Sequence, residues 1–159
     1  TPSCIGRTAW IFKGVFPIDK LDEVASRCNK SDEIVSFIVN LDDSTEKGSH
    51  WCACYIDKSV NKSINYYDSY AREPPLRFLK DIELIVSKIK PRYYLKLKVN
   101  RIVQQSVSSD TCGWFSLRFL FDMSRGKEFK DCTKFSEVKK NEKDIKLFKE
   151  KFKKFDVLI

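Results

Sequence analysis

The segment Cys112–Met123 is apolar around nearly its whole circumference. A helix of this kind has no face to offer to water, so it is expected to lie buried in the middle of a domain. The chain has 159 residues, the length of one domain, and we predict a single domain over residues 1–159. The other elements must therefore build one core around this helix.

The spacing of apolar residues predicts those other elements. Three further helices are expected, at Pro17–Cys28, Leu76–Lys88 and Asn141–Phe155. Four strands are expected, at Glu33–Leu41, Trp51–Ile56, Ser63–Tyr70 and Tyr94–Val103. The second and third strands form an antiparallel hairpin, and the fourth alternates, with Leu95, Leu97 and Val99 on its buried face. This order predicts an α+β fold around a mostly antiparallel central sheet.

The charge is unevenly distributed. The chain has 30 Lys and Arg against 22 Asp and Glu, a net charge of +8. Between Lys88 and Arg101 there are six basic residues and no acid, and lysines are dense again from Lys139 to Lys154. Such segments attract polyanions, so DNA is a candidate partner or activator. The alternative is that they are ordinary solvated faces of a strand and a helix.

Composition and termini give further expectations. The longest apolar runs are far shorter than the roughly 18 residues of a membrane span, and no signal peptide is visible, so we expect an intracellular, non-secreted protein without membrane contact. The six cysteines lack the spacing of a disulfide framework or a paired zinc site. Even Cys52 and Cys54, on one face of a strand, are poor metal ligands here, and most of the thiols are expected to be buried and free. We expect no metal ion or cofactor.

Cys112 differs from the other cysteines because it stands where a polar loop becomes the buried helix. The N-terminus of a helix stabilises a thiolate, and Gly113 leaves the neighbouring backbone open to a substrate. A nucleophilic cysteine needs a base, and His50 is the only histidine in the chain. Asp68 lies on the strand that pairs with the one His50 precedes, at the same end of the hairpin, where it can orient the imidazole. Together these three residues are candidates for nucleophilic catalysis; taken singly, each also fits a structural role, as a helix-start cysteine, a partly buried histidine or a turn aspartate.

The motifs around these residues resemble those of the adenovirus proteinase family, which also includes the SUMO-specific proteases and maturation proteases of large DNA viruses, virophages and Maverick-type elements. The resemblance covers about Gly14 to Met123. It rests on Ile38-Val39-Asn40, Gly48-Ser49-His50-Trp51, Tyr67-Asp68-Ser69-Tyr70, Val103-Gln104-Gln105-Ser106 and Cys112-Gly113-Trp114-Phe115. In that family a glutamine precedes the cysteine by six or seven residues. Gln105 stands seven residues before Cys112 and fits better than Gln104, which stands eight before it.

The resemblance implies a papain-like cysteine protease fold with the nucleophile at the N-terminus of the buried helix. It implies that Cys112 is the nucleophile, His50 the general base and acid, Asp68 the orienting residue and Gln105 a side-chain donor to the oxyanion, with the backbone N–H of Cys112 as the second donor. The adenovirus enzyme receives an activating peptide through a disulfide. The corresponding stretch here, Pro91 to Arg101, contains no cysteine, so the resemblance does not extend to that mode of activation.

The implied function is a cysteine endopeptidase that cleaves viral capsid or core precursors after small, Gly-rich sites through a thioester during virion maturation. It would act as a monomer in the host cytoplasm or nucleus and in the virion. The alternative within the same chemistry is a deconjugating peptidase for a ubiquitin-like modifier of the SUMO type. The alternative from another class is a basic nucleic-acid-binding module that kept an inactive protease fold.

Overall fold

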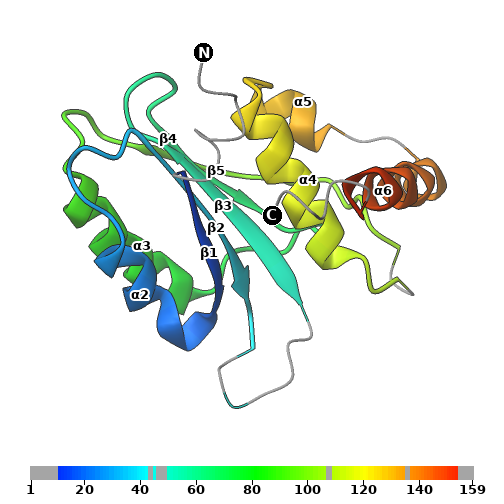
Figure 1. The fold of residues 1–159 in the computed structure, drawn as a ribbon, viewed down its shortest axis with the longest axis horizontal. Helices are drawn as coiled ribbons and strands as arrows, with labels where there is room; N and C mark the ends of the chain where they lie inside the picture. Colours follow the sequence, from blue (N-terminus) through cyan, green and yellow to red (C-terminus); the bar gives the residue numbers. More distant parts are fainter. Residues whose placement is uncertain (1–10, 43–44, 46–49, 107–108, 135–136, 154–159) are drawn as a thin grey trace.

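A five-stranded sheet in the order β1-β2-β3-β4-β5 divides the structure into two helical layers (Figure 1). The computed structural model describes residues 11–42, 45, 50–106, 109–134 and 137–153. Its strands are β1 Phe12–Pro17, β2 Ile34–Asn40, β3 Trp51–Asp57, β4 Ser63–Tyr67 and β5 Lys96–Val99. Its helices are the 3-10 turn η1 Ile18–Lys20, followed by α2 Leu21–Ser26, α3 Leu76–Ile89, α4 Cys112–Ser124, α5 Phe129–Thr133 and α6 Val138–Lys153.

The sheet is antiparallel at its centre, where β2 pairs with β3 and β3 with β4. The outer strands join in parallel, β1 on β2 and β5 on β4. The predicted α+β fold is therefore confirmed. Helices cover both faces of the sheet, which explains why β2 and β3 are continuous apolar runs instead of alternating ones.

The helices α2 and α3 cover one face of the sheet, and α4, α5 and α6 cover the other (Figure 1). On the first side, Leu21, Phe37 and Phe78 belong to a large buried apolar cluster. On the second side, Tyr67, Phe119 and Ile145 join β4, α4 and α6 in a second cluster. The rings of Tyr67 and Phe119 stack with centroids 4.6 Å apart. This stacking fixes α4 against the middle of the sheet.

The expectation that α4 is enclosed on every side is only partly right. Its inward residues, including Phe115, Phe119 and Met123, are buried, but Phe121 is 40% exposed. The helix lies in an outer layer between the sheet and α6 rather than at the centre of the fold. Phe121 instead packs partly against Phe148 of α6, with ring centroids 6.0 Å apart.

Several predicted boundaries are wrong for local reasons. β1 was not predicted because it is a short edge strand, irregular near Gly14, and Val15 is 50% exposed, so it carries no clear hydrophobic period. The predicted helix at Pro17–Cys28 is a 3-10 turn followed by the short α2. The helix expected to begin at Asn141 begins at Val138, and the five-residue α5 was not predicted. The helix α3, in contrast, begins at Leu76 as predicted.

Two predicted strands are too long. The strand expected to run to Tyr70 ends at Tyr67, because the backbone of Asp68 bonds to a side chain instead of a strand. The strand expected over Tyr94–Val103 is only Lys96–Val99. Leu97 was expected on a buried face but is 38% exposed, since β5 lies at the edge of the sheet. Some residues that the sequence predictions covered lie outside the described residues: Gly48, Ser49, Lys154, Phe155 and Cys4, which is one of the six cysteines expected not to form a disulfide framework.

No helix in the described part of the chain is both long and apolar enough to cross a membrane.

Candidate active site

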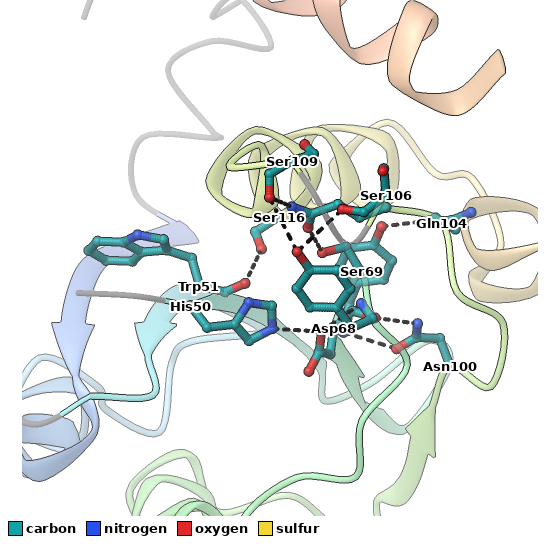
Figure 2. Close-up of polar contacts among 12 residues, drawn as sticks. His50, Trp51, Asp68, Ser69, Asn100, Gln104, Ser106, Ser109 and Ser116 are labelled. Carbon is teal, nitrogen blue, oxygen red and sulfur yellow. Dashed lines mark hydrogen bonds and ion pairs between the residues drawn. The ribbon is translucent and has the colours of Figure 1, made fainter. Parts of the chain in front are cut away.

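The central hairpin brings His50 and Asp68 together at one end of the sheet. Ala53 of β3 pairs with Tyr67 of β4, so the residues just before β3 lie opposite those just after β4. The His50 carbonyl accepts a hydrogen bond from the Leu41 N–H at 2.9 Å, which fixes the histidine beside β2. The His50 Nε2 and Asp68 Oδ1 atoms are 2.7 Å apart, and both side chains are buried (Figure 2). The sequence placed these two residues at the same end of the hairpin, and the structure joins them.

Asp68 is held rigidly where β4 ends. Its N–H donates to Asn100 Oδ1 at 3.0 Å, and Asn100 Nδ2 donates to its carbonyl at 2.7 Å (Figure 2). The Tyr70 N–H donates to Asp68 Oδ1 at 2.7 Å, so the oxygen that faces His50 also closes a local turn. The other carboxylate oxygen, Oδ2, is buried and has no hydrogen-bond partner in the described structure. The carboxylate therefore keeps a fixed orientation toward the imidazole.

Cys112 is the first residue of α4, as the sequence predicted, and it is buried. The Ser116 hydroxyl, one helical turn later, donates to the Trp51 carbonyl at 3.1 Å and ties the start of α4 to the start of β3 (Figure 2). This bond brings the cysteine beside the histidine. A Cβ added to Gly113 would meet only the Trp51 ring, at an ordinary contact distance of 3.8 Å. Packing alone therefore does not require glycine at this position, whereas access to the thiol gives a reason for it.

Cys112 and His50 each shift the pKa of the other in the direction that favours a charged pair. Burial disfavours the thiolate, but the bond to His50 and backbone hydrogen bonds from Trp51 and Gly113 outweigh it and lower the Cys112 pKa. Burial also disfavours the imidazolium, but the bonds to Asp68, Cys112 and Cys52 raise the His50 pKa above its usual value. The geometry thus favours a thiolate–imidazolium pair.

Gln105 is 1% exposed, and hydrogen bonds hold its amide at both ends. Its Oε1 accepts from the Ser69 hydroxyl, and its Nε2 donates to the Ser109 carbonyl at 2.9 Å. An amide nitrogen carries two hydrogens, and the Ser109 carbonyl takes one of them. Gln104 points elsewhere: it accepts from the Tyr67 hydroxyl at 2.6 Å and donates to the Lys134 carbonyl at 3.1 Å. Among the described residues of the loop that precedes Cys112, the side chain of Gln105 has a hydrogen-bond partner and that of Gln104 does not.

Cys52 is a second thiol near the imidazole, fully buried in β3. Among the described residues, His50, Cys52 and Asp68 are one group whose possible ligand atoms all lie within 4.8 Å of one another. The imidazole and the carboxylate already bond to each other, so the group is a hydrogen-bonded pair beside a thiol. Burial raises the pKa of Cys52, which leaves Cys112 as the more acidic of the two thiols beside the imidazole.

Sequence reasoning missed three residues that shape the site: Asn100, Tyr70 and Ser116. The Tyr70 ring stacks on the His50 ring with centroids 5.0 Å apart, and its hydroxyl donates to the Ser109 carbonyl at 3.2 Å. The alternating pattern placed Asn100 on the exposed face of its strand, but the side chain is 2% exposed. Its role therefore left no signal in the sequence. Ser116 is a polar residue within an apolar helix, which could have marked a specific contact.

The sequence of the chain matches the model of a known protease family. Residues 20–157 match the Ulp1 protease family, C-terminal catalytic domain. No curated protein sequence is significantly similar to the chain.

Several solved structures share the fold. The ASFV pS273R protease is 17% identical over 89% of this chain and 63% of its own, with a TM-score of 0.65. The Ulp1 protease domain in complex with Smt3, the yeast ortholog of SUMO, is 16% identical over 82% of this chain and 67% of its own, with a TM-score of 0.53. The central domain of Lpg1148 from Legionella pneumophila is 11% identical over 94% of this chain and 90% of its own, with a TM-score of 0.56. The chain spans 41% to 63% of the length of the pS273R protease in the two structures it matches.

Proposed function

Because the chain belongs to the Ulp1 protease family, a family of cysteine proteases, we propose that it hydrolyses peptide bonds with Cys112 as the nucleophile. The observation that carries this proposal is the buried His50–Asp68 hydrogen bond, which lies beside a Cys112 thiol at the start of α4 whose pKa the imidazole lowers. A histidine held in this way can stabilise a thiolate and deliver a proton, which a purely structural histidine does not need to do.

In the proposed mechanism, the Cys112 thiolate attacks the scissile carbonyl carbon and the carbonyl oxygen becomes an oxyanion. The backbone N–H of Cys112 and the Gln105 amide would donate to that oxygen. The His50 imidazolium gives its proton to the leaving amine, and the C–N bond breaks to leave a thioester. The neutral imidazole then takes a proton from water, the resulting hydroxide attacks the thioester, and the acid product leaves as the thiolate is restored. Asp68 keeps the imidazole oriented throughout.

For the substrate, we propose capsid or core precursor proteins of a DNA virus or related element, cut after small residues such as a Gly-Gly pair. The resemblance to the adenovirus proteinase family and the shared fold of the ASFV pS273R protease support this proposal. A role in virion maturation would place the protein in the host cytoplasm or nucleus and in the virion.

A second candidate is removal of a ubiquitin-like modifier, because the Ulp1 domain solved in complex with Smt3 shares the fold. In either case, Cys112, His50, Asp68 and Gln105 would catalyse cleavage after a Gly-Gly pair. A nucleic-acid-binding module without activity is disfavoured, because a binding module has no need for a buried histidine–aspartate pair beside a thiol whose pKa the histidine lowers.

One experiment separates these candidates. The purified protein and its Cys112→Ala variant are each incubated with a Gly-Gly-containing capsid precursor and with a SUMO-type precursor, and the products are identified by mass spectrometry. The maturation role is supported if the parent protein cuts the capsid precursor and not the modifier precursor, and the Cys112→Ala variant cuts neither. Deconjugation is supported if the parent protein cuts the modifier precursor and not the capsid precursor. If neither substrate is cut, the proposed substrate class is wrong.

Asp68→Asn is expected to reduce activity less than loss of His50 and to move the alkaline limb of the pH–rate profile to lower pH. Burial lowers the His50 pKa, and the hydrogen bond to Asp68 raises it. An amide cannot stabilise the imidazolium as a carboxylate does, so the variant loses its proton at lower pH. Measuring kcat/KM against pH for both proteins checks this. An unchanged alkaline limb would show that Asp68 does not control the titration of His50.

DNA binding is proposed through exposed basic residues. Lys88, Lys90, Arg92 and Lys96 are exposed around the end of α3 and the start of β5. We expect duplex DNA to bind, with an affinity that falls steeply with salt because bound counterions are released. Changing these four residues to alanine should weaken binding and make the salt dependence shallower, by about 0.9 in log–log slope for each phosphate that the variant no longer neutralises.

The matched control changes Lys139, Lys140, Lys143 and Lys146, four exposed lysines of α6, to alanine. Loss of DNA affinity in this variant alone would assign the binding to α6. Turnover measured with and without DNA shows whether DNA is an activator. No binding at low salt would rule out the DNA role and leave the protease proposal unaffected.

A further inference from the structure

The carboxylate of Glu142, in the C-terminal helix α6, holds both ends of the loop that precedes Cys112. Its Oε1 accepts from the Ser106 N–H at 2.8 Å. Its Oε2 accepts from the Ser109 and Thr111 hydroxyls, each at 3.2 Å. A side chain 31 to 36 residues further along the chain therefore fastens one end of this loop to the other.

This loop connects two groups of the proposed oxyanion site. Gln105 directly precedes Ser106, and Thr111 directly precedes Cys112. The Gln105 amide donates to the Ser109 carbonyl, so its direction depends on where Ser109 lies. The Ser109 and Thr111 hydroxyls lie next to each other, and each can use its one hydrogen to donate to the same carboxylate oxygen. A shift of this loop would move both proposed donors relative to the thiol.

Glu142 is well placed to prevent that shift. It is half-buried on α6, and Ile145 on the same helix is 1% exposed within the apolar cluster that includes Phe119 of α4. The helix is thus anchored against α4, and a carboxylate fixed on it gives the loop a rigid reference. Hydrogen bonds to a charged acceptor are stronger than neutral ones, so three of them on one side chain are a substantial restraint.

We propose that Glu142 is a positioning residue for catalysis: it holds Ser106, Ser109 and Thr111 in place so that Gln105 and the Cys112 N–H face the developing oxyanion together. This inference rests on the proposed protease function. Glu142 does not contact His50 or Asp68 through any hydrogen bond of the described structure, and its effect is on the oxyanion donors rather than on the thiolate–imidazolium pair.

The test compares Glu142→Ala, Glu142→Gln and the control Glu150→Ala, which removes an exposed carboxylate from the same helix. For Glu142→Ala, kcat is expected to fall by up to about 100-fold, the loss that a misplacement of about 1 Å can cause, with KM little changed. The rate at which iodoacetamide alkylates Cys112 should stay near that of the parent, because alkylation needs the thiolate and not the oxyanion donors. Glu142→Gln should recover most of kcat, since its amide oxygen can still accept from the Ser106 N–H. Glu150→Ala should match the parent.

Three results would overturn the inference: an unchanged kcat in Glu142→Ala, an alkylation rate that falls as much as kcat does, or a Glu142→Gln variant as slow as Glu142→Ala. If Glu142→Ala does not fold, Ser109→Ala carries the test by removing one of the loop donors to the carboxylate, and an unchanged kcat there contradicts the proposal. Cleavage by the parent and none by Cys112→Ala are established first. Failure of the protease function is then seen in the parent, and failure of this inference only in the Glu142 and Ser109 variants.

Discussion

Replacing Cys112 with alanine is expected to reduce proteolysis to the background rate and leave the fold intact. The thiolate forms the covalent intermediate, and no other group in the proposed mechanism can replace it. Alanine is well tolerated in a helix, and the Ser116 bond to β3 still holds α4 in place. Cleavage is followed by product mass, and folding by thermal unfolding.

The matched control is Cys132→Ala, which removes a partly exposed thiol on α5 and should keep full activity. Burial raises the pKa of Cys132 to about 12 and that of Cys28 to about 11, whereas the pKa of Cys112 is lowered. A thiol alkylator should therefore label Cys112 fastest among the described cysteines. Parent-like cleavage by the Cys112 variant would refute the nucleophile.

His50→Ala is expected to be nearly as damaging as loss of the nucleophile, by at least about 10⁴-fold in kcat, because members of such a triad act as a unit. The chain has only one histidine, so no second imidazole can take over the proton transfer. The double variant His50→Ala/Cys112→Ala should be no slower than Cys112→Ala alone, since the effects of coupled residues are not additive.

Folding of the His50 variant is checked separately, because the imidazole is buried against the Tyr70 ring. Tyr70→Phe keeps that ring and serves as the control for packing. If His50→Ala melts like the parent and still cleaves at the parental rate, the assignment of the base is wrong.

The sequence was sufficient to predict the hairpin and the helix start that carry His50, Asp68 and Cys112. The hairpin between Trp51 and Tyr67 is short and strongly apolar, so its pairing could be predicted, and with it the closeness of His50 and Asp68. The start of α4 could be predicted at Cys112 because a polar loop meets an apolar helix there. Local patterns of this kind are informative because the turn and the helix start depend on residues close together in the sequence.

The unpredicted features depend on contacts between distant residues. Asn100 fixes Asp68 across 32 positions, and Glu142 reaches the loop before Cys112 across 31 to 36 positions. Neither contact leaves a period or a turn signal in the sequence. β5 was predicted too long because alternation in Tyr94–Val103 reports strand propensity and not how much of the strand finds a partner. Long-range polar contacts of this kind need the structure.

The central claim is that Cys112 and His50 form a thiolate–imidazolium pair, and the pH dependence of Cys112 alkylation by iodoacetamide tests it without any knowledge of the substrate. For the parent protein, the alkylation rate is expected to reach its plateau at lower pH than it would for an ordinary thiol, because interactions with His50 and with the backbone outweigh the effect of burial and lower the Cys112 pKa. In His50→Ala, the plateau should move to higher pH, since the largest contribution that lowers the Cys112 pKa is removed. A parent profile that rises only near the ordinary thiol pKa and is identical in His50→Ala would contradict the account.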